Sequence, residues 1–336
     1  MASVDSVNDT WFDEFNAVFA GVISLVFNVV LIYATLQVKF YSDEVKRMQI
    51  FVSALRLLFS GTVVLCSPTL AYIIEAEAVY IVKGGFSLGV SFGRFLLILF
   101  ATFVIFSCLG APMQFIQVVF IVKKASRTKR ELVLFTTIAS FAISMTATLL
   151  IYFGYTPDDF DDELSEEIVY NLNGKGHSAY LIASLQRFDF DDKKWVPDPI
   201  SWACTLYILA VLVMSTVVSV TCWSCIRWQW RKGAKSSNSN KAQQQLITVL
   251  IVQFTIPFLT IHIPFYVSFL MPLFRVETLH LSVYLPYLFS WCPAINPIVV
   301  LIMVKSIREK VFTRSTKKAL HISSANIVIK PKSASP

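Results

Sequence analysis

The sequence predicts an all-α membrane protein whose fold is a bundle of seven transmembrane helices. Three observations predict this fold: seven long apolar stretches, a high proportion of hydrophobic residues, and loops whose charge alternates in sign along the chain. A helix needs about 20 apolar residues to cross a hydrocarbon core of about 30 Å, and each stretch reaches that length. The predicted helices span residues 15–38, 49–74, 87–122, 132–155, 200–226, 246–274 and 279–304.

Composition excludes a soluble protein. Hydrophobic residues make up 55% of the 336 residues and charged residues only 15%, whereas a soluble domain has about 25% charged residues. The net charge of +7 comes from bases beside the ends of the apolar stretches. Such bases are attracted by the anionic lipids of the inner leaflet, so membrane lipid is the expected partner and nucleic acid is not.

The charges of the connecting segments predict the orientation. The tail 1–14 and the loops 75–86, 156–199 and 275–278 hold 6 Lys/Arg and 18 Asp/Glu. The other loops (39–48, 123–131, 227–245) and the tail 305–336 hold 21 Lys/Arg and 4 Asp/Glu. The positive-inside rule therefore predicts an extracellular N-terminus and a cytoplasmic C-terminus, which requires an odd number of crossings.

The two tails fit this orientation. Residues 1–14 lack Lys and Arg, and the stretch 15–38 is too long for the apolar part of a cleavable signal peptide, so it is predicted to be a signal anchor. Asn8 begins the single N-x-S/T glycosylation sequon, in the tail predicted to be extracellular. In the cytoplasmic tail, Ile307 and Val311 with interleaved bases predict a short amphipathic helix on the membrane surface.

The loop 156–199 is long and acidic, and two interpretations of it stay open. The runs 168–170 and 179–182 flank Asn173-Gly-Lys-Gly, which is typical of a strand, a turn and a second strand. The loop is either a lid over an outward cavity or a solvated acidic loop with no role in ligand binding.

The apolar segments contain few ionisable residues. None contains Asp or Glu, so no buried carboxylate is present for acid–base chemistry, and neither an enzyme nor a cofactor site is predicted. The six cysteines lie in or at the ends of apolar segments, and the Cys222-x-x-Cys225 pair has no second ligand pair for a metal. Arg56 is expected to contact carbonyls or polar groups in the bundle. Arg94 either reaches outward to the acidic loop or anchors a ligand, and His262 is either an interior polar residue or a pocket residue.

Prolines cluster in the last two segments. Segment six contains Pro257, Pro264 and Pro272, and segment seven contains Pro286, Pro293 and Pro297. An interior proline removes a backbone hydrogen bond and kinks a helix. Kinked helices are typical of a bundle that switches between two packings, although static kinks also occur in membrane helices.

Short motifs in several segments resemble those of a known receptor family. The run from Gln245 through Gln253 to Pro257 is similar to the sixth helix of nematode serpentine chemoreceptors. The run Pro293-Ala-Ile-Asn296-Pro297, followed by the basic stretch 305–308, resembles the end of their seventh helix. Asn28, Pro68 and the long acidic loop also match. The resemblance is to the Str-like superfamily (Str, Srd, Srh, Sri and Srj groups, with Srd or Str favoured), which are divergent G protein-coupled receptors.

Two departures from the pattern affect what the resemblance implies. The end of segment three reads Gln114-Phe-Ile-Gln117-Val-Val-Phe120 and lacks the Tyr-Arg-Tyr-like element of many relatives, so other bases must serve in coupling. The loop 156–199 has no cysteine, so the disulfide that ties helix three to this loop in rhodopsin-like receptors cannot form.

The resemblance implies a chemosensory receptor in the plasma membrane, in the cilium of a sensory neuron, that detects a small odorant-like molecule and activates a heterotrimeric G protein. The expected ligand contacts are Arg94, Tyr207, His262, Tyr266 and Tyr284. The expected elements of coupling and switching are Lys123, Lys124, Arg227, Arg231, Asn296 and Pro297.

Two other classes stay open at this point. A small-solute transporter would have repeated halves and coupling acids, and the sequence has neither by inspection. A ligand-gated channel, as some insect seven-helix odorant receptors are, would require multimers and the opposite orientation.

Overall fold

Seven apolar helices form the body of the protein in a computed structural model, which describes residues 10–37, 43–73, 78–83, 89–122, 129–157, 179–189, 194–233, 250–267, 284–304 and 307–308. Six helices in this part of the chain are long and apolar enough to cross a membrane. The seventh, α10, has 19 residues, which is about 28 Å of helix and close to the thickness of a bilayer core. The helices are α1 (Thr10–Gln37), α2 (Asp43–Cys66), α3 (Val90–Val122), α4 (Lys129–Tyr155), α6 (Pro199–Gly233), the helix Leu250–Val267, and α10 (Leu285–Met303).

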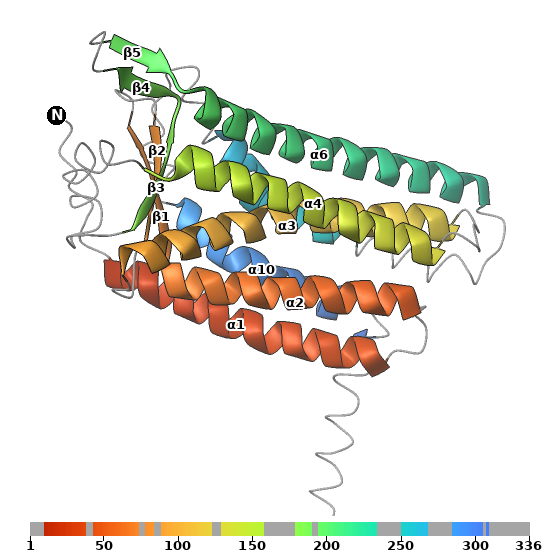
Figure 1. Ribbon diagram of the computed structural model, residues 1–336. Coiled ribbons are helices and arrows are strands. Elements are labelled where there is room, and N and C mark those ends of the chain that lie inside the picture. Colours follow the sequence, from red (N-terminus) through yellow and green to blue (C-terminus); the bar gives the residue numbers. More distant parts are fainter. Residues whose placement is uncertain are drawn as a thin grey trace, which may run out of the picture.

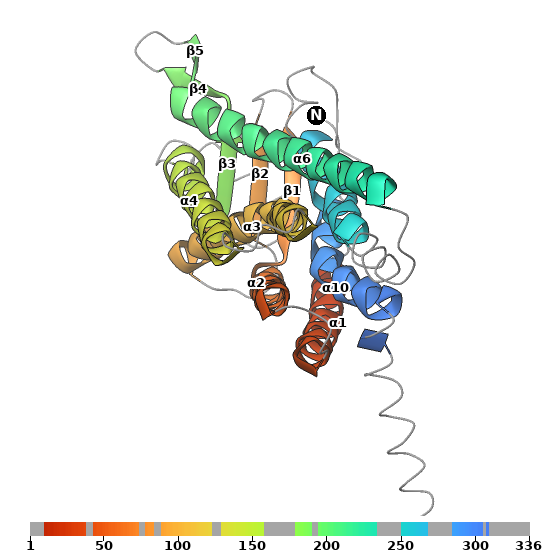
Figure 2. The same ribbon diagram turned by 90° about the vertical axis from the view of Figure 1, so that its right-hand side faces the viewer.

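The helix α3 lies in the middle of the bundle. It packs against α2, α4 and α6 and against the π-helical turn η2 (Phe258–His262) of the helix Leu250–Val267. The helix α1 packs against α2 and α10 at the edge, and Figure 2 shows α3 surrounded by its neighbours. In agreement with this position, α3 is the most deeply buried of the candidate membrane spans in the described part of the chain.

The surface of the bundle is apolar and part of its interior is polar. On α4, large apolar side chains three or four residues apart face outward, and Phe135 is 69% exposed. Ser24, Asn28 and Ser144 are by contrast fully buried. An apolar surface of this extent is stable in lipid and not in water, so the chain is a multi-pass membrane protein.

A small antiparallel sheet covers one end of the bundle, at the left in Figure 1. Its strands are β1 (Pro68–Ile73), β2 (Ala78–Lys83) and β3 (Tyr180–Ser184), in that order, with Tyr80 opposite Ile182. The side chain of Leu181 on β3 is fully buried in the main apolar core, and β3 contacts α3, α4 and α6. A hairpin of β4 (Gln186–Asp189) and β5 (Lys194–Pro197) follows. We call this end of the bundle the sheet end.

The prediction of a helix over 49–74 was wrong in its second part, because α2 ends at Cys66 and β1 begins at Pro68. Pro68 has no N–H to continue the helix and disfavours helical geometry in the preceding residue. Ser67 accordingly has a φ of 38°, although its N–H still donates to the Val63 carbonyl over 2.7 Å. The chain turns there into the sheet.

Other boundaries also differ from the predictions. The helix α6 continues past residue 226 to Gly233, so Arg227 and Arg231 lie in a helix and not in a loop. The predicted strand at 179–182 is confirmed as β3, but it pairs with β2, and its predicted partner 168–170 lies outside the described residues. Of the predicted amphipathic helix in the tail, Ile307 and Arg308 are helical and the rest lies outside the described residues.

The helix Leu250–Val267 contains a π-helical turn where prolines predicted a distortion. Pro257 precedes the turn, and the N–H of Ile263 donates to the Phe258 carbonyl five residues back. Pro264 follows and supplies no N–H to the preceding turn. A π turn is rare and shifts the register of the side chains beyond it. The structure thus has an irregular turn between Pro257 and Pro264, two of the prolines at which the sequence predicts kinks.

Candidate functional site

A column of rings follows the π turn along the helix Leu250–Val267. The ring centroid of His262 lies 5.7 Å from that of Phe258 and 6.3 Å from that of Tyr266. Phe254 continues the column, 5.5 Å from Phe258. We call these four residues the ring column. Such spacing is that of interacting aromatic side chains.

His262 connects three helices through hydrogen bonds. Its Nε2 lies 3.3 Å from the hydroxyl of Ser215 on α6, and that hydroxyl donates to the Cys108 carbonyl on α3 over 2.6 Å. The Ser215 hydroxyl proton points to Cys108 and the Nδ1 of His262 lies 3.4 Å from the Pro257 carbonyl, so a neutral ring can donate to only one of the Ser215 oxygen and the Pro257 carbonyl. The hydroxyls of Tyr266 and Thr216, the latter also on α6, lie 3.3 Å apart. The ring column is thus attached to α6 at two neighbouring positions.

The structure does not bring the other three predicted ligand residues to this column. The guanidinium of Arg94 lies 5.7 Å from the ring centroid of Tyr180 on β3, at the sheet end. Tyr207 donates its hydroxyl proton to the Ile143 carbonyl of α4 over 3.1 Å. Tyr284 precedes α10 and is 63% exposed. Only His262 and Tyr266 of the five therefore lie side by side.

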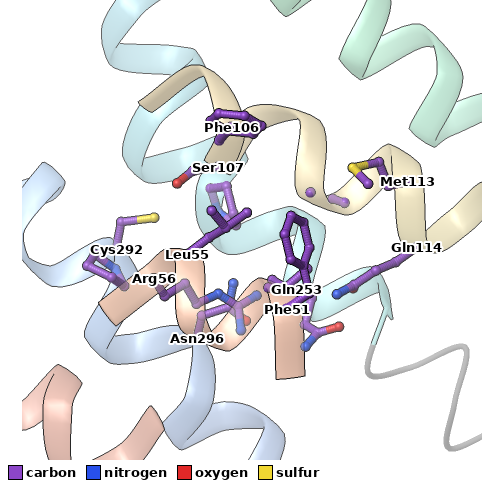
Figure 3. A pocket seen from close by; sticks show the side chains of 15 residues that line it. Phe51, Leu55, Arg56, Phe106, Ser107, Met113, Gln114, Gln253, Cys292 and Asn296 are labelled. Carbon is purple, nitrogen blue, oxygen red and sulfur yellow. The ribbon is translucent and has the colours of Figure 1, made fainter. Parts of the chain in front are cut away.

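A small cavity lies between α2, α3, the helix Leu250–Val267 and α10 (Figure 3). We call it the inner cavity. Its volume is about 30 Å³, which is room for one or two waters and far below the roughly 300–1,000 Å³ of a pocket for a drug-sized ligand. Its polar lining side chains are Arg56, Ser107, Gln114, Gln253, Cys292 and Asn296.

One of the predicted switch residues, Asn296, lines the inner cavity, and the other, Pro297, is the next residue of α10. Asn296 is 1% exposed and lines the cavity, and its Oδ1 is buried without a hydrogen-bond partner in the described part of the chain. Pro297 follows inside α10. Its ring cannot donate to the Pro293 carbonyl four residues earlier, and Asn28 of α1 donates its Nδ2–H to that carbonyl over 3.1 Å. The broken bond of α10 is thus replaced by a bond from α1.

The predicted coupling bases are only partly described. Arg227 is exposed on α6 with its guanidinium 5.4 Å from the ring centroid of Trp223. The backbone of Arg231 belongs to α6, whereas Lys123, Lys124 and the sequon residue Asn8 lie outside the described residues. Within the described ranges no three His, Cys, Asp or Glu side chains are placed to hold a metal, and the six cysteines are free.

Sequence reasoning missed Ser215, Thr216 and Gln114 as members of these sites. A signal for them was present, because polar residues recur in otherwise apolar stretches. Ser215 and Ser219 are four residues apart and both are buried, which is the spacing of one helix face. Which neighbour such a face contacts, however, depends on the packing of the helices.

The seven helices, the distorted sixth helix and the proline-containing seventh helix define the seven-transmembrane receptor fold of G protein-coupled receptors. The crystal structure of squid rhodopsin matches with a TM-score of 0.59 at 16% sequence identity, over 93% of this chain and 86% of that chain. This similarity concerns the fold.

The sequence comparisons identify the family. Residues 14–312 match the family model of the serpentine type 7TM GPCR chemoreceptor Str. The chain belongs to this family and is a chemosensory G protein-coupled receptor. The G-protein coupled receptor str-33 of Caenorhabditis elegans is 24% identical over 309 residues, which is 87% of each chain. These relatives are receptors and not enzymes, and membership decides among receptor, transporter and channel in favour of the receptor.

Proposed function

We propose that this receptor detects a small odorant-like molecule of apolar or amphipathic character at the sheet end and activates a heterotrimeric G protein at the opposite end. The sheet end is extracellular in this proposal, and the protein resides in the plasma membrane, in the cilium of a sensory neuron. The charge pattern supports this orientation, with 21 bases and 4 acids in the segments assigned to the cytoplasm.

The position of the π turn carries the proposal. Pro257, which precedes the turn, lines the inner cavity. The turn itself carries Phe258 and His262 of the ring column, and Tyr266 follows it. A ligand that packs against His262 and Tyr266 therefore acts on the same backbone that forms one wall of the cavity. Single π turns inside α-helices are rare and are found frequently at functional sites.

The proposed mechanism is a shift between two packings. A ligand that binds one arrangement of the ring column better than the other increases the population of that arrangement. Movement of the helix Leu250–Val267 and of α10 around Asn296 and Pro297 then opens the end opposite the sheet. Arg227, Arg231, Lys123 and Lys124 are the bases proposed to contact the G protein there.

Asn8 is proposed to be glycosylated on the extracellular side. The remaining candidates for ligand contact in this proposal lie in the half of the bundle nearer the sheet: Arg94, Tyr207 and Tyr284. Direct ligand contact is proposed first for His262 and Tyr266, because they adjoin each other.

The test is a calcium or cAMP response in cells that express the receptor with a reporter, screened over volatile compounds. With an agonist in hand, Tyr266→Ala is expected to raise the half-maximal concentration about tenfold or more, because it removes an aromatic contact of about 1.5 kcal/mol. Tyr266→Phe, which keeps the ring, is expected to have a smaller effect. Tyr152→Ala is the matched control, because Tyr152 lies on the outer face of α4 and is 54% exposed.

Surface expression is measured for each variant. If Tyr266→Ala and His262→Phe both give the same dose–response curve as the wild type at equal surface density, the ring column does not contact the ligand.

A further inference from the structure

Arg56 is a buried cation whose position the receptor mechanism above does not use. It lies in the interior of α2 and is 9% exposed. Its Nη1 is buried without a hydrogen-bond partner among the described residues. Figure 3 shows Arg56 from α2 and Gln114 from α3 at the same inner cavity, which both residues line.

No carboxylate compensates this charge within the cavity. The 15 residues that line it include neither Asp nor Glu. The nearest acid along the same helix, Glu44, is twelve residues away, or about 18 Å of helix. A buried charge without a counterion is costly, by several kcal/mol in a low-dielectric interior. Water in the cavity would supply hydrogen bonds but no opposite charge.

The side chains around Arg56 favour an anion. Gln114 and Gln253 bring amide N–H groups to the cavity and Ser107 brings a hydroxyl. The amide nitrogen of Gln253 makes only a long contact of 3.4 Å, with Gln49. These groups can donate hydrogen bonds alongside the guanidinium, and Asn296 adds its amide to the same lining, with an Oδ1 acceptor that has no partner among the described residues.

The volume limits the size of the anion. The cavity of about 30 Å³ exceeds the roughly 10–15 Å³ that one water requires. It accommodates a monatomic ion and is too small for a multi-atom organic acid. We propose that the inner cavity is a chloride site, in which the Arg56 guanidinium and the donors from α3 and the helix Leu250–Val267 hold the ion.

Chloride at this site stabilises the packing of four helices. The cavity is lined from α2, α3, the helix Leu250–Val267 and α10, so an ion that contacts Arg56 and the neighbouring donors connects them. A ligand that binds the folded receptor and not the unfolded chain raises its melting temperature by mass action. This effect requires neither an odorant nor a G protein, and its outcome is independent of the function proposed above.

The test uses the purified full-length receptor in detergent and measures its Tm. Chloride is titrated against gluconate at constant ionic strength with sodium as the common cation. Chloride is expected to raise the Tm saturably by about 2–4 °C, and bromide to do the same, while gluconate has no effect. Arg56→Gln is expected to lose this rise. Arg47→Gln, on an exposed position of the same helix, is the matched control and is expected to retain it.

Three results would overturn the proposal. A wild-type Tm that is equal in chloride and gluconate would mean that the cavity holds water only. A chloride-dependent rise that persists in Arg56→Gln would place the ion elsewhere. If Arg56→Gln does not fold, Gln114→Leu replaces it and is expected to raise the half-saturating chloride concentration about tenfold, as the loss of one donor to an anion does. An unchanged half-saturating concentration in Gln114→Leu would equally count against the site.

Discussion

Asn28 can be used to test how the helical bundle compensates for the backbone hydrogen bond that Pro297 cannot donate. Its side chain is fully buried on α1, and its Nδ2 lies 2.9 Å from the Ser24 carbonyl and 3.1 Å from the Pro293 carbonyl. The Pro293 carbonyl has no donor within α10, because Pro297 has no N–H. Asn28→Ala is therefore expected to leave a buried carbonyl unsatisfied at the contact between α1 and α10.

The magnitude follows from two contributions. A hydrogen bond between transmembrane helices contributes about 0.6 kcal/mol on average and up to about 1.7. A buried carbonyl left without a donor costs about 1–3 kcal/mol. We expect Asn28→Ala to lower the free energy of unfolding by about 2 kcal/mol, which corresponds to a fall of about 4–8 °C in Tm.

The assay is thermal unfolding followed by a thiol-reactive fluorogenic dye. It suits this protein because four free cysteines, Cys66, Cys108, Cys204 and Cys292, are buried and react only on unfolding. Thr146→Ala is the matched control, because the exposed Thr146 hydroxyl donates within α4 to the Ala142 carbonyl over 3.0 Å. Its Tm is expected to change by about 1 °C or less.

A double mutant isolates the proposed cause. In Pro297→Ala, the restored N–H of residue 297 donates to the Pro293 carbonyl, so adding Asn28→Ala should cost about 1 kcal/mol less than it costs in the wild type. An equal cost of Asn28→Ala in both backgrounds would refute the explanation through the Pro293 carbonyl. A Tm for Asn28→Ala equal to that of Thr146→Ala would refute the importance of the bond itself.

Two further predictions concern helix packing and orientation. A Cβ at Gly154 would lie 3.2 Å from the Ile200 carbonyl oxygen and 3.3 Å from the Cys204 Cβ, so Gly154→Ala should separate α4 from α6 and cost about 1–3 kcal/mol in stability. Gly61→Ala, whose Cβ meets nothing within 4 Å, should be neutral or stabilising, and equal melting temperatures for the two variants would contradict this. In intact cells, antibodies should reach an N-terminal epitope tag and not a C-terminal one, and the reverse staining would refute the predicted orientation. A mobility shift on deglycosylation should disappear in Asn8→Gln.

Hydrophobic length was enough to predict the helical bundle. Each span depends on local composition, because a bilayer demands a long apolar helix whatever its neighbours are. The helix end at Cys66 was predictable in principle from Ser67-Pro68, since proline acts on its own neighbourhood. The sheet was not predictable in the same way. Its strands β2 and β3 pair across about a hundred residues of chain, and the short apolar runs that form them do not indicate their partners.

The sites were predicted less completely than the fold. His262 was singled out as an ionisable residue between Pro257 and Pro264 and Tyr266 as an aromatic residue, and the structure places them together with Ser215 and Thr216 of α6. Tyr284 and Tyr207 were chosen because aromatic residues line many pockets, but the direction of a side chain depends on the rotation of its helix. The sequence alone already showed that Arg56, a charged residue inside an apolar segment, needs polar contacts in the bundle. Its place at a cavity without carboxylates emerged only from the packing of four helices.

The sequence by itself thus determined that the chain forms a seven-transmembrane helix bundle and which receptor family it belongs to. These properties depend on transfer of each segment into lipid and on local motifs. The tertiary structure decided what the buried polar residues contact: the Asn28 bond to the Pro293 carbonyl, the link of His262 to Ser215, and the cavity at Arg56. The physical reason is that a polar group in the bundle is satisfied by a neighbouring helix, and helix rotation and pairing are properties of the whole assembly.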